Sequence, residues 1–337
     1  MPISLAEIAA RAGVSLATAS RALNGKGGVK PGTRERILAI AREFNYSPSM
    51  VARGLATTRT DTIGFVVHQR HAPFDLDPFY PIIMHGVVTE LAHHGYHLLL
   101  SLVNDEQLKS DEHFKPIVEN RVDGIIVVGP DIPPRFILQL RQQGIPLLLV
   151  DNMMTSVAVD SVNSDDVRGG WQATEHLQQH GHRTIVALLG PAHWHSSARR
   201  GQGYSEAMAA AGLPTHLFHA SDTTVETGKQ LIKEALATVP DLTAVFAVND
   251  AMALGAMQVL AQQQRKVPED VALIGFDDTN FSALTEPSLS TIRVFKNELG
   301  RLAARRMLDI LSETDNPPVQ TLVATELIPR RSCGCTV

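Results

Sequence analysis

The chain has 337 residues, of which 44% are hydrophobic and 19% are charged, with a formal net charge of −5. This length suggests two or three domains, and the composition is that of an ordinary globular protein, not of a disordered or collagen-like chain. The sequence has no apolar run of about 18 residues and no signal peptide after Met1, so we expect a cytoplasmic protein with no membrane partner.

The charge is distributed unevenly along the chain. Residues 1–60 carry nine Lys or Arg against three Glu, a net charge of +6, which leaves −11 on the other 277 residues. A basic head on an acidic body is typical of a polyanion-binding module joined to a domain that need not touch the polyanion.

The first segment, from Ser4 to Asn24, predicts two short helices joined by a tight turn. Apolar residues in its first half recur at the spacing of a buried helical face. Gly13 suits a left-handed turn, and Ser15 suits the N-cap of the second helix. This pattern indicates a helix-turn-helix, whose second helix enters the major groove of DNA. An ordinary helical hairpin is the alternative.

Two further helical segments are predicted before residue 60. Proline suits a first helical turn, so a third helix is expected from Pro31 to Phe44. Ser49 then precedes eight or nine helix-compatible residues, weakened by Gly54, which are too few for a stable isolated helix. We predict a hinge helix that folds on binding, with a plain linker as the alternative. The expected domains are a head over 1–48 and a hinge helix with linker over 49–60.

From Thr62 onward, strand-like apolar runs alternate with amphipathic helices, and many runs end in Gly, Asp or Asn. The predicted strands lie at 62–67, 97–103, 124–130, 145–152, 157–162, 184–190, 244–250 and 271–278. The predicted helices lie at 79–94, 133–143, 169–180, 200–211, 227–237 and 251–263. Near-continuous apolar strands indicate parallel sheets covered on both faces, so the predicted body is α/β, with two lobes and a ligand cleft between them.

Four segments, in order, resemble the lactose/galactose repressor (LacI/GalR) family of bacterial transcription regulators. They are AGVSLATASRALN, YSPSMVARGL, VNDAMALGAM and VALIGFDDT. The resemblance covers nearly the whole chain and implies a helix-turn-helix head, a hinge helix and a two-lobed body similar to periplasmic sugar-binding proteins. It places lobe one at 61–161 plus 293–321 and lobe two at 162–292 plus 322–331. Lys30 stands where a Ser commonly caps the third helix, so we expect that cap to be weak.

The resemblance implies a homodimer bound to a pseudo-palindromic DNA operator. Leu16 and Ala17 fall at positions that read base edges, but both are apolar, so Arg21 is the expected specific reader of guanine. In the hinge, Leu55 would wedge into the minor groove, accompanied by Ala52 and Arg53. The residues expected to contact phosphates are Ser4, Thr18, Asn24, Thr33 and Tyr46.

In the body, the resemblance carries effector-binding roles to Asp151, Arg200, Asn249 and Asp277. A guanidinium beside carboxylates and an amide suits the hydroxyls of a sugar, so we expect a small carbohydrate-like effector and no cofactor. For each polar residue, a salt bridge or a strand-end cap is the alternative. An aromatic floor is expected from Phe79, Tyr80 or Trp194. Whether the effector releases DNA or acts as a corepressor is left open.

The cysteines and histidines give a weaker pattern. Cys333 and Cys335 are expected in an exposed tail, with too few thiols for a disulfide framework or a four-ligand zinc site. The pairs His93/His97 and His176/His180 have an i, i+4 spacing that can seat zinc, but no third ligand is assured. We therefore predict no metal site.

Two other classes of function compete with a regulator. A sugar-binding protein without DNA regulation would leave residues 1–58 without a purpose. An enzyme is disfavoured because no P-loop, G-x-S-x-G motif or closed metal set is present in the sequence. The prediction is an effector-controlled, DNA-binding repressor, not an enzyme.

Overall fold

The computed structural model describes residues 3–23, 25, 27–44, 46, 59–71, 78–109, 116, 119–312 and 317–335. The chain divides into two compact units, Met1–Asp61 and Thr62–Val337. The predicted hinge residues Ala52, Arg53 and Leu55, and also Asn24 of the head, lie outside the described residues. None of the helices in the described ranges is long and apolar enough to cross a membrane.

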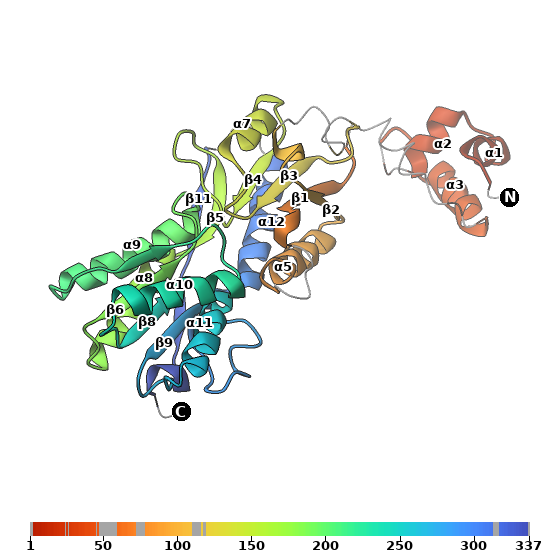
Figure 1. Ribbon diagram of the computed structural model, residues 1–337. Coiled ribbons are helices and arrows are strands. Elements are labelled where there is room, and N and C mark those ends of the chain that lie inside the picture. Colours follow the sequence, from red (N-terminus) through yellow and green to blue (C-terminus); the bar gives the residue numbers. More distant parts are fainter. Residues whose placement is uncertain are drawn as a thin grey trace. The chain divides into compact units, whose positions relative to one another are not determined.

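The head contains three helices, α1 (Leu5–Arg11), α2 (Leu16–Leu23) and α3 (Pro31–Glu43) (Figure 1). Ser4 and Glu7 form a reciprocal capping box at the start of α1. Gly13 follows with a φ of 62°, and Ser15 Oγ accepts a hydrogen bond from the Thr18 amide at 3.2 Å. These features confirm the predicted turn and cap. Residues from all three helices form the buried core of the head, which contains Ile8, Ala12, Ala22, Ile37 and Ala41.

The start of α3 departs from the pattern of a capped helix, as expected. Lys30 occupies its N-cap position and makes no side-chain capping hydrogen bond in the described part of the chain. Pro31 follows in the first turn, where its missing N–H removes one of the groups that a cap would satisfy. The helix therefore begins without a side-chain cap.

The second unit is an α/β body built on two six-stranded sheets (Figure 1). Sheet one has the order β11-β5-β4-β3-β1-β2, and sheet two has the order β12-β10-β9-β8-β6-β7. The pairs in sheet one are parallel, whereas β12 runs antiparallel to β10 in sheet two. Most strands are buried on both faces, which explains their near-continuous apolar sequences. The predicted fold class is thus confirmed.

The strands of sheet one are β1 (Thr62–His68), β2 (His97–Val103), β3 (Gly124–Val128), β4 (Leu147–Val150), β5 (Asp160–Ser164) and β11 (Gln320–Val323). Those of sheet two are β6 (Ile185–Leu189), β7 (Leu217–His219), β8 (Ala244–Ala247), β9 (Ala272–Asp277), β10 (Ser290–Arg293) and β12 (Glu326–Ile328). Lobe one comprises sheet one with the helices α5 (Phe79–His93), α7 (Pro134–Gln142) and α12 (Lys296–Ser312). Lobe two comprises sheet two with α8 (Asp166–Gln179), α9 (His195–Ala210), α10 (Val225–Thr238) and α11 (Asp250–Gln262). Three short 3-10 helices complete the described elements: η1 (Gln69–His71), η2 (Gln107–Lys109) and η3 (Arg331–Cys333).

The chain crosses between the lobes three times, each time slightly later than the resemblance implied. Strand β5 stays in sheet one up to Ser164, and β11 pairs with it in parallel up to Val323. Residues 162–164 and 322–323 therefore belong to lobe one, not to lobe two as expected. Arg293, which was assigned to lobe one, ends β10 in sheet two. The pairing of backbone strands sets these lobe boundaries, and strand pairing cannot be read from a single sequence.

Two predictions about cysteine and histidine placement are wrong. The C-terminal segment is not an exposed tail, because Cys333 is only 1% exposed and packs against the core. The pair His93/His97 does not share a helix, because α5 ends at His93 and β2 begins at His97. A Gly at residue 95, with a φ of 75°, makes the turn between them.

Three helix pairs in the body cross with their backbones in near contact. At the α8–α9 crossing, a Cβ on Gly203 would lie 2.0 Å from the Val167 carbonyl oxygen, and one on Gly170 would lie 2.2 Å from that of Arg200. Reciprocal glycines also occur at the α5–α12 and α10–α11 crossings, as Gly86 with Gly300 and Gly228 with Gly255. Only glycine permits so close an approach.

Replacing Gly203 with alanine is expected to lower the free energy of unfolding of the body by about 1–3 kcal/mol or more, because the added methyl group must push two backbones apart. Denaturant unfolding of the full chain measures the loss. Gly32→Ala, in α3, is the matched control, since a Cβ there meets nothing within 4 Å and helix propensity favours alanine. Equal stability of wild type and Gly203→Ala would contradict the close crossing.

Candidate functional site

A cavity of about 1140 Å³ lies in the body and is lined by both lobes. Lobe one contributes residues from the end of β1, from η1, from the start of α5 and from the segments after β3 and β4. Lobe two contributes the start of α9, the segment before α10 and the segments after β8 and β9. The cavity thus lies at the carboxyl ends of parallel strands, where open α/β sheets bind ligands.

Arg200, from α9, is the centre of a buried ion cluster at the cavity wall. It is 5% exposed. Its Nε donates to Asp166 Oδ1 at 2.8 Å, and its Nη1 donates to Asp277 Oδ1 at 3.1 Å and to the Val248 carbonyl at 2.7 Å. The guanidinium also lies 3.8 Å from the ring centroid of Phe276. Arg200 is therefore held in one orientation by its own lobe.

Arg200 stays positively charged although it is buried. Burial alone would lower the pKa of Arg200, but Asp166, Asp277 and Asp151 together raise it above its usual value. A fixed cation surrounded by carboxylates offers donors of fixed direction to a ligand oxygen.

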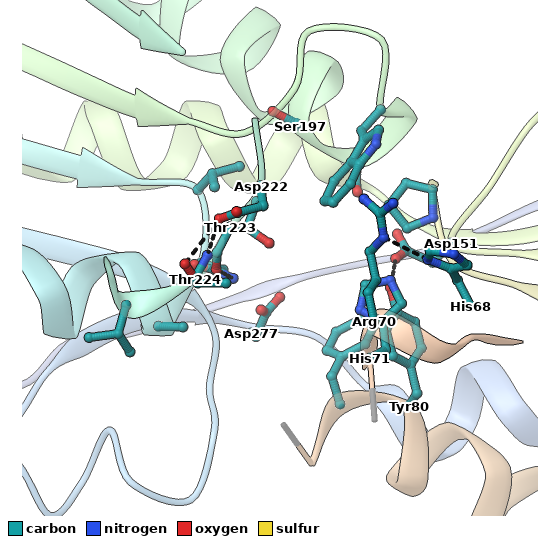
Figure 2. Close-up of a pocket in the computed structure, with 18 of the residues that line it drawn as sticks. His68, Arg70, His71, Tyr80, Asp151, Ser197, Asp222, Thr223, Thr224 and Asp277 are labelled. Atoms are coloured by element: carbon teal, nitrogen blue, oxygen red, sulfur yellow. Dashed lines mark hydrogen bonds between the residues drawn. The ribbon is translucent and has the colours of Figure 1, made fainter. Parts of the chain in front are cut away.

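Asp151 follows β4 and lies in lobe one, with a left-handed φ of 52°. Its carboxylate accepts a hydrogen bond from the Tyr80 hydroxyl at 3.1 Å (Figure 2). Burial raises the pKa of Asp151 to about 7, and Asp166 also raises it, against the opposing effect of Arg200. Near neutral pH this group can both donate and accept hydrogen bonds, which suits a hydroxyl ligand.

Asn249 and Asp277, the other two predicted polar residues, both line the cavity. Asn249 also caps α11, since its Oδ1 accepts from the Met252 amide at 2.9 Å and its Nδ2 donates to the Thr223 carbonyl at 3.0 Å. The capping alternative is therefore realised for Asn249. Asp277 ends β9 with a φ of 106° and carries the ion pair to Arg200.

The loop after β9 is fixed by Asp250, the first residue of α11, which is fully buried. Its Oδ2 accepts hydrogen bonds from the Thr279 amide at 2.8 Å and from the Ser282 hydroxyl at 2.6 Å, and its Oδ1 accepts from the Thr291 hydroxyl at 2.6 Å. Burial raises the pKa of Asp250, and these hydrogen bonds oppose that rise. Asp250 thereby positions the part of the cavity wall that contains Thr279.

The aromatic residues expected to form a floor all line the cavity. Phe79 and Tyr80, at the start of α5, pack edge to face with ring centroids 5.1 Å apart. Trp194, the N-cap residue of α9, is 5% exposed, and its ring centroid is 6.5 Å from that of His71. The cavity therefore has apolar rings in both lobes.

A basic group after β1 was not predicted. His68, Arg70 and His71 line the cavity around the buried Asp131. Arg70 Nε donates to His68 Nδ1 at 2.6 Å, and His71 Nε2 lies 3.1 Å from Asp131 Oδ1. Burial lowers the pKa of His68, which favours the neutral ring, although Asp131 opposes this. For Asp131 itself, burial would raise the pKa, but the hydrogen bond from His71 and the nearby cations lower it. The run HQRH directly after a buried strand was the signal in the sequence.

Polar groups of lobe two face this basic group across the cavity. Figure 2 shows Asp222, Thr223 and Thr224 on the side opposite His71 and Tyr80. Asp222 Oδ1 accepts from the Thr224 amide at 3.1 Å. Ser197 also lines the cavity, and its buried Oγ has no hydrogen-bond partner among the described residues. The sequence did not predict this hydroxyl as part of the site.

In the head, the second helix of the predicted helix-turn-helix presents an exposed surface. Leu16 is 53% exposed, and Ala17 and Arg21 are also exposed. Thr18 is half-buried and its hydroxyl lies 2.8 Å from that of Ser15. The hydroxyl of Ser4 is within its capping box, 2.8 Å from Glu7 Oε2. Thr33 and Tyr46 are half-buried. The proposed DNA contacts of these residues stay predictions.

Comparisons with known protein families match both parts of the chain. A model of bacterial regulatory proteins of the lacI family matches residues 4–49, and a periplasmic binding protein-like domain matches residues 174–333. Among solved structures, a complex of the transcriptional regulator CelR with cellobiose is 31% identical, with a TM-score of 0.74, and covers 98% of this chain and 99% of that chain. A lac repressor dimer bound to operator and the anti-inducer ONPF is 25% identical, with a TM-score of 0.85, and covers 99% of each chain.

Curated relatives extend the similarity over the full length. The HTH-type transcriptional regulator CelR of Thermobifida fusca is 33% identical over 98% of both chains. The HTH-type transcriptional repressor CytR of Escherichia coli (strain K12) is 29% identical over 98% of this chain and 96% of the relative. With a helix-turn-helix head and a two-lobed body in the same order, the chain belongs to the lacI family of bacterial regulatory proteins.

Proposed function

We propose that this protein is a homodimeric transcriptional repressor whose binding to a pseudo-palindromic operator is controlled by a small carbohydrate in the cavity of the body. The observation that carries the effector proposal is the composition of the cavity wall. It joins a fixed guanidinium at Arg200, a carboxyl at Asp151 with a pKa of about 7, and the hydroxyl of Ser197, which no described residue hydrogen-bonds. Sugar hydroxyls, which both donate and accept hydrogen bonds, complement such a set.

The size and rings of the cavity favour a sugar larger than one ring. A volume of about 1140 Å³ is slightly above the range of about 300–1,000 Å³ that is typical of small-ligand sites. Trp194 and Phe79 offer apolar faces against which the C–H faces of a sugar can pack. A relative with 31% identity was solved with cellobiose, which supports a disaccharide for this chain.

The regulatory step couples the cavity to the DNA. The effector would bind one arrangement of the two lobes more tightly than another, and the lobes pass that preference to the dimer and its hinge segments. We propose that the sugar acts as an inducer that releases the operator. The lac repressor dimer on its operator supports the dimeric state for this chain. The proposal includes a cytoplasmic location, where the operator DNA lies, and no enzymatic activity, since operator binding requires no catalysis.

The proposed function is tested with the full chain, the DNA flanking its own gene and a panel of sugars. Footprinting should reveal a protected two-fold site, and the effective sugar should raise the melting temperature and release that DNA. A Trp171→Phe variant leaves Trp194 as the single tryptophan, whose fluorescence should change on sugar binding. A chain that binds sugar but protects no DNA would instead be a sugar-binding protein without DNA regulation.

Arg21→Ala is expected to weaken binding to the preferred operator by about 1–3 kcal/mol and to relax the base preference at one position of each half-site, because a bidentate contact to guanine is lost. Lys30→Ala is the comparison variant, since an exposed lysine near phosphates should affect all sequences alike. Titration of operator and single-base variants measures both. Full base discrimination in Arg21→Ala would remove Arg21 from this role.

A further inference from the structure

Two histidines at the end of α8 and two cysteines of the C-terminal segment meet in lobe two, and none of the four lines the sugar cavity. His176 lies in the last turn of α8 and His180 caps its end, while Cys333 ends η3 and Cys335 follows two residues later. Each of the four ligand atoms lies close to at least one of the others. His176 Nε2 lies 3.3 Å from Cys333 Sγ and 3.5 Å from Cys335 Sγ, His180 Nε2 lies 3.4 Å from Cys335 Sγ, and the two Sγ atoms are 3.3 Å apart.

These four separations match the distances between ligand atoms around a single tetrahedral metal ion. With Zn–S bonds of about 2.3 Å and Zn–N bonds of about 2.0–2.1 Å, neighbouring ligand atoms lie about 3.3–3.8 Å apart. The nitrogen and sulfur atoms of His176, His180 and Cys335 all lie within 4.8 Å of one another. Cys333 contacts His176 and Cys335 but stands outside this three-residue group, so its Sγ would have to move toward His180 to complete the ligand set.

The cysteine side of this cluster is held by backbone and hydroxyl contacts. Ser332, next to Cys333, donates from its hydroxyl to the Leu273 carbonyl at 2.6 Å and from its amide to the Ser288 carbonyl at 3.0 Å. Gly334 then adopts a left-handed φ of 90°, which turns the chain back and brings Cys335 beside Cys333. The C-x-C segment therefore has a fixed shape on sheet two.

The histidine side is oriented as well. His180 Nδ1 lies 2.9 Å from the His176 carbonyl oxygen, so the Nδ1–H donates there and Nε2 is left as the free lone pair toward Cys335. A hydrogen bond from the other ring nitrogen is the usual support of a metal-bound histidine. Because His180 is exposed, an ion can enter from the solvent, and because Cys333 is buried, the bound ion would be shielded from solvent on that side.

We propose that His176, His180, Cys333 and Cys335 bind one zinc ion in a closed structural site that joins the C-terminal segment to α8. Two thiolates and two imidazoles in a tetrahedral arrangement select zinc over oxygen-seeking metals such as magnesium and calcium. With four protein ligands no coordination position stays open, so the ion supports structure and not catalysis. The ion would fix the chain that has just made its third crossing between the lobes.

The proposal is tested on the full chain, purified without a histidine tag and without chelators. Elemental analysis should find about one zinc per chain, and Co²⁺ in its place should give the strong ligand-field and thiolate charge-transfer absorption of a tetrahedral S₂N₂ site. Cys335→Ser and His180→Ala should each weaken zinc binding more than about 100-fold. The double variant His93→Ala/His97→Ala, which alters two exposed histidines of lobe one, should keep the zinc.

A readout on the wild-type chain covers the case in which a ligand variant fails to fold. A strong chelator should lower the melting temperature, and zinc, but not magnesium, should restore it. The proposal is overturned by a chain that takes up no zinc, by a preference for another metal over zinc, by a Cys333–Cys335 disulfide that persists in protein purified with a reductant, or by equal zinc loss in the His93/His97 control.

Discussion

Arg200→Ala is expected to lower the free energy of unfolding of the body by about 3–5 kcal/mol and to abolish the response to the effector. The loss arises because Asp166 and Asp277 keep their buried carboxylates but lose the cation that both contact. The Val248 carbonyl loses its donor at the same time. Deleting one member of a buried ion cluster leaves uncompensated charge, which costs more than the intact cluster contributes.

Denaturant unfolding and sugar-dependent release of operator DNA measure the two effects separately. Arg199→Ala is the matched control. Within the described residues, the guanidinium of Arg199 donates one hydrogen bond, to the side chain of Gln202. We expect that control to change stability by less than about 0.5 kcal/mol and to keep the effector response. A stable Arg200→Ala protein that still released DNA with sugar would show that the cluster neither supports the lobe nor contacts the effector.

Asp151→Asn is expected to stabilise the body above pH 7, by up to about 4 kcal/mol, and to flatten its dependence on pH. In the folded state the pKa of Asp151 is about 7, far above the usual value of 3.8. The folded state therefore holds a proton that the unfolded chain releases between these two values. The stability that this proton provides is fully present below about pH 4 and is lost as the pH rises through about 7. Asparagine carries no charge and avoids this loss.

Unfolding at about pH 5 and about pH 8.5 measures this change. Above about pH 7, where the carboxylate of Asp151 is charged, the same Asp151→Asn variant should bind the sugar about 10-fold more weakly, since a hydrogen bond to a charged acceptor becomes one to a neutral amide. An unchanged pH slope in Asp151→Asn would mean that another group carries the proton.

The parts of the fold that the sequence predicted are those encoded within a few residues. Ser15 caps α2 three residues away, and Gly13 needs only its own φ, so the head was predictable from local chemistry. The long buried strands of the body were equally predictable, from their near-continuous apolar sequences. Strands β7, β10, β11 and β12, of three or four residues each, are too short to show an alternation. Helix α12 was missed although Leu299, Ala303 and Met307 form a buried stripe at i+4 spacing.

The polar residues of the candidate site were predictable only where the family resemblance marked a position, whereas the aromatic residues Phe79, Tyr80 and Trp194 were proposed without it. The resemblance identified Asp151, Arg200, Asn249 and Asp277, and all four line the cavity. It could not reveal what each side chain contacts, because Asp166 reaches Arg200 from another helix, 34 residues away. The cysteine–histidine cluster illustrates the same limit more strongly. Cys333 and His176 are 157 residues apart, and between them the chain passes into lobe one and returns to lobe two, so only the tertiary fold brings them together.

The reciprocal glycines at the α8–α9 crossing have a mechanical consequence for the cavity. Asp166 begins α8 and Arg200 lies on α9, and the two helices touch through backbone atoms instead of adaptable side chains. Sliding one helix past the other would drive carbonyl oxygens into main-chain atoms. Lobe two therefore moves as a rigid body. We expect a ligand to change the body by rotating one lobe relative to the other about the three crossover segments.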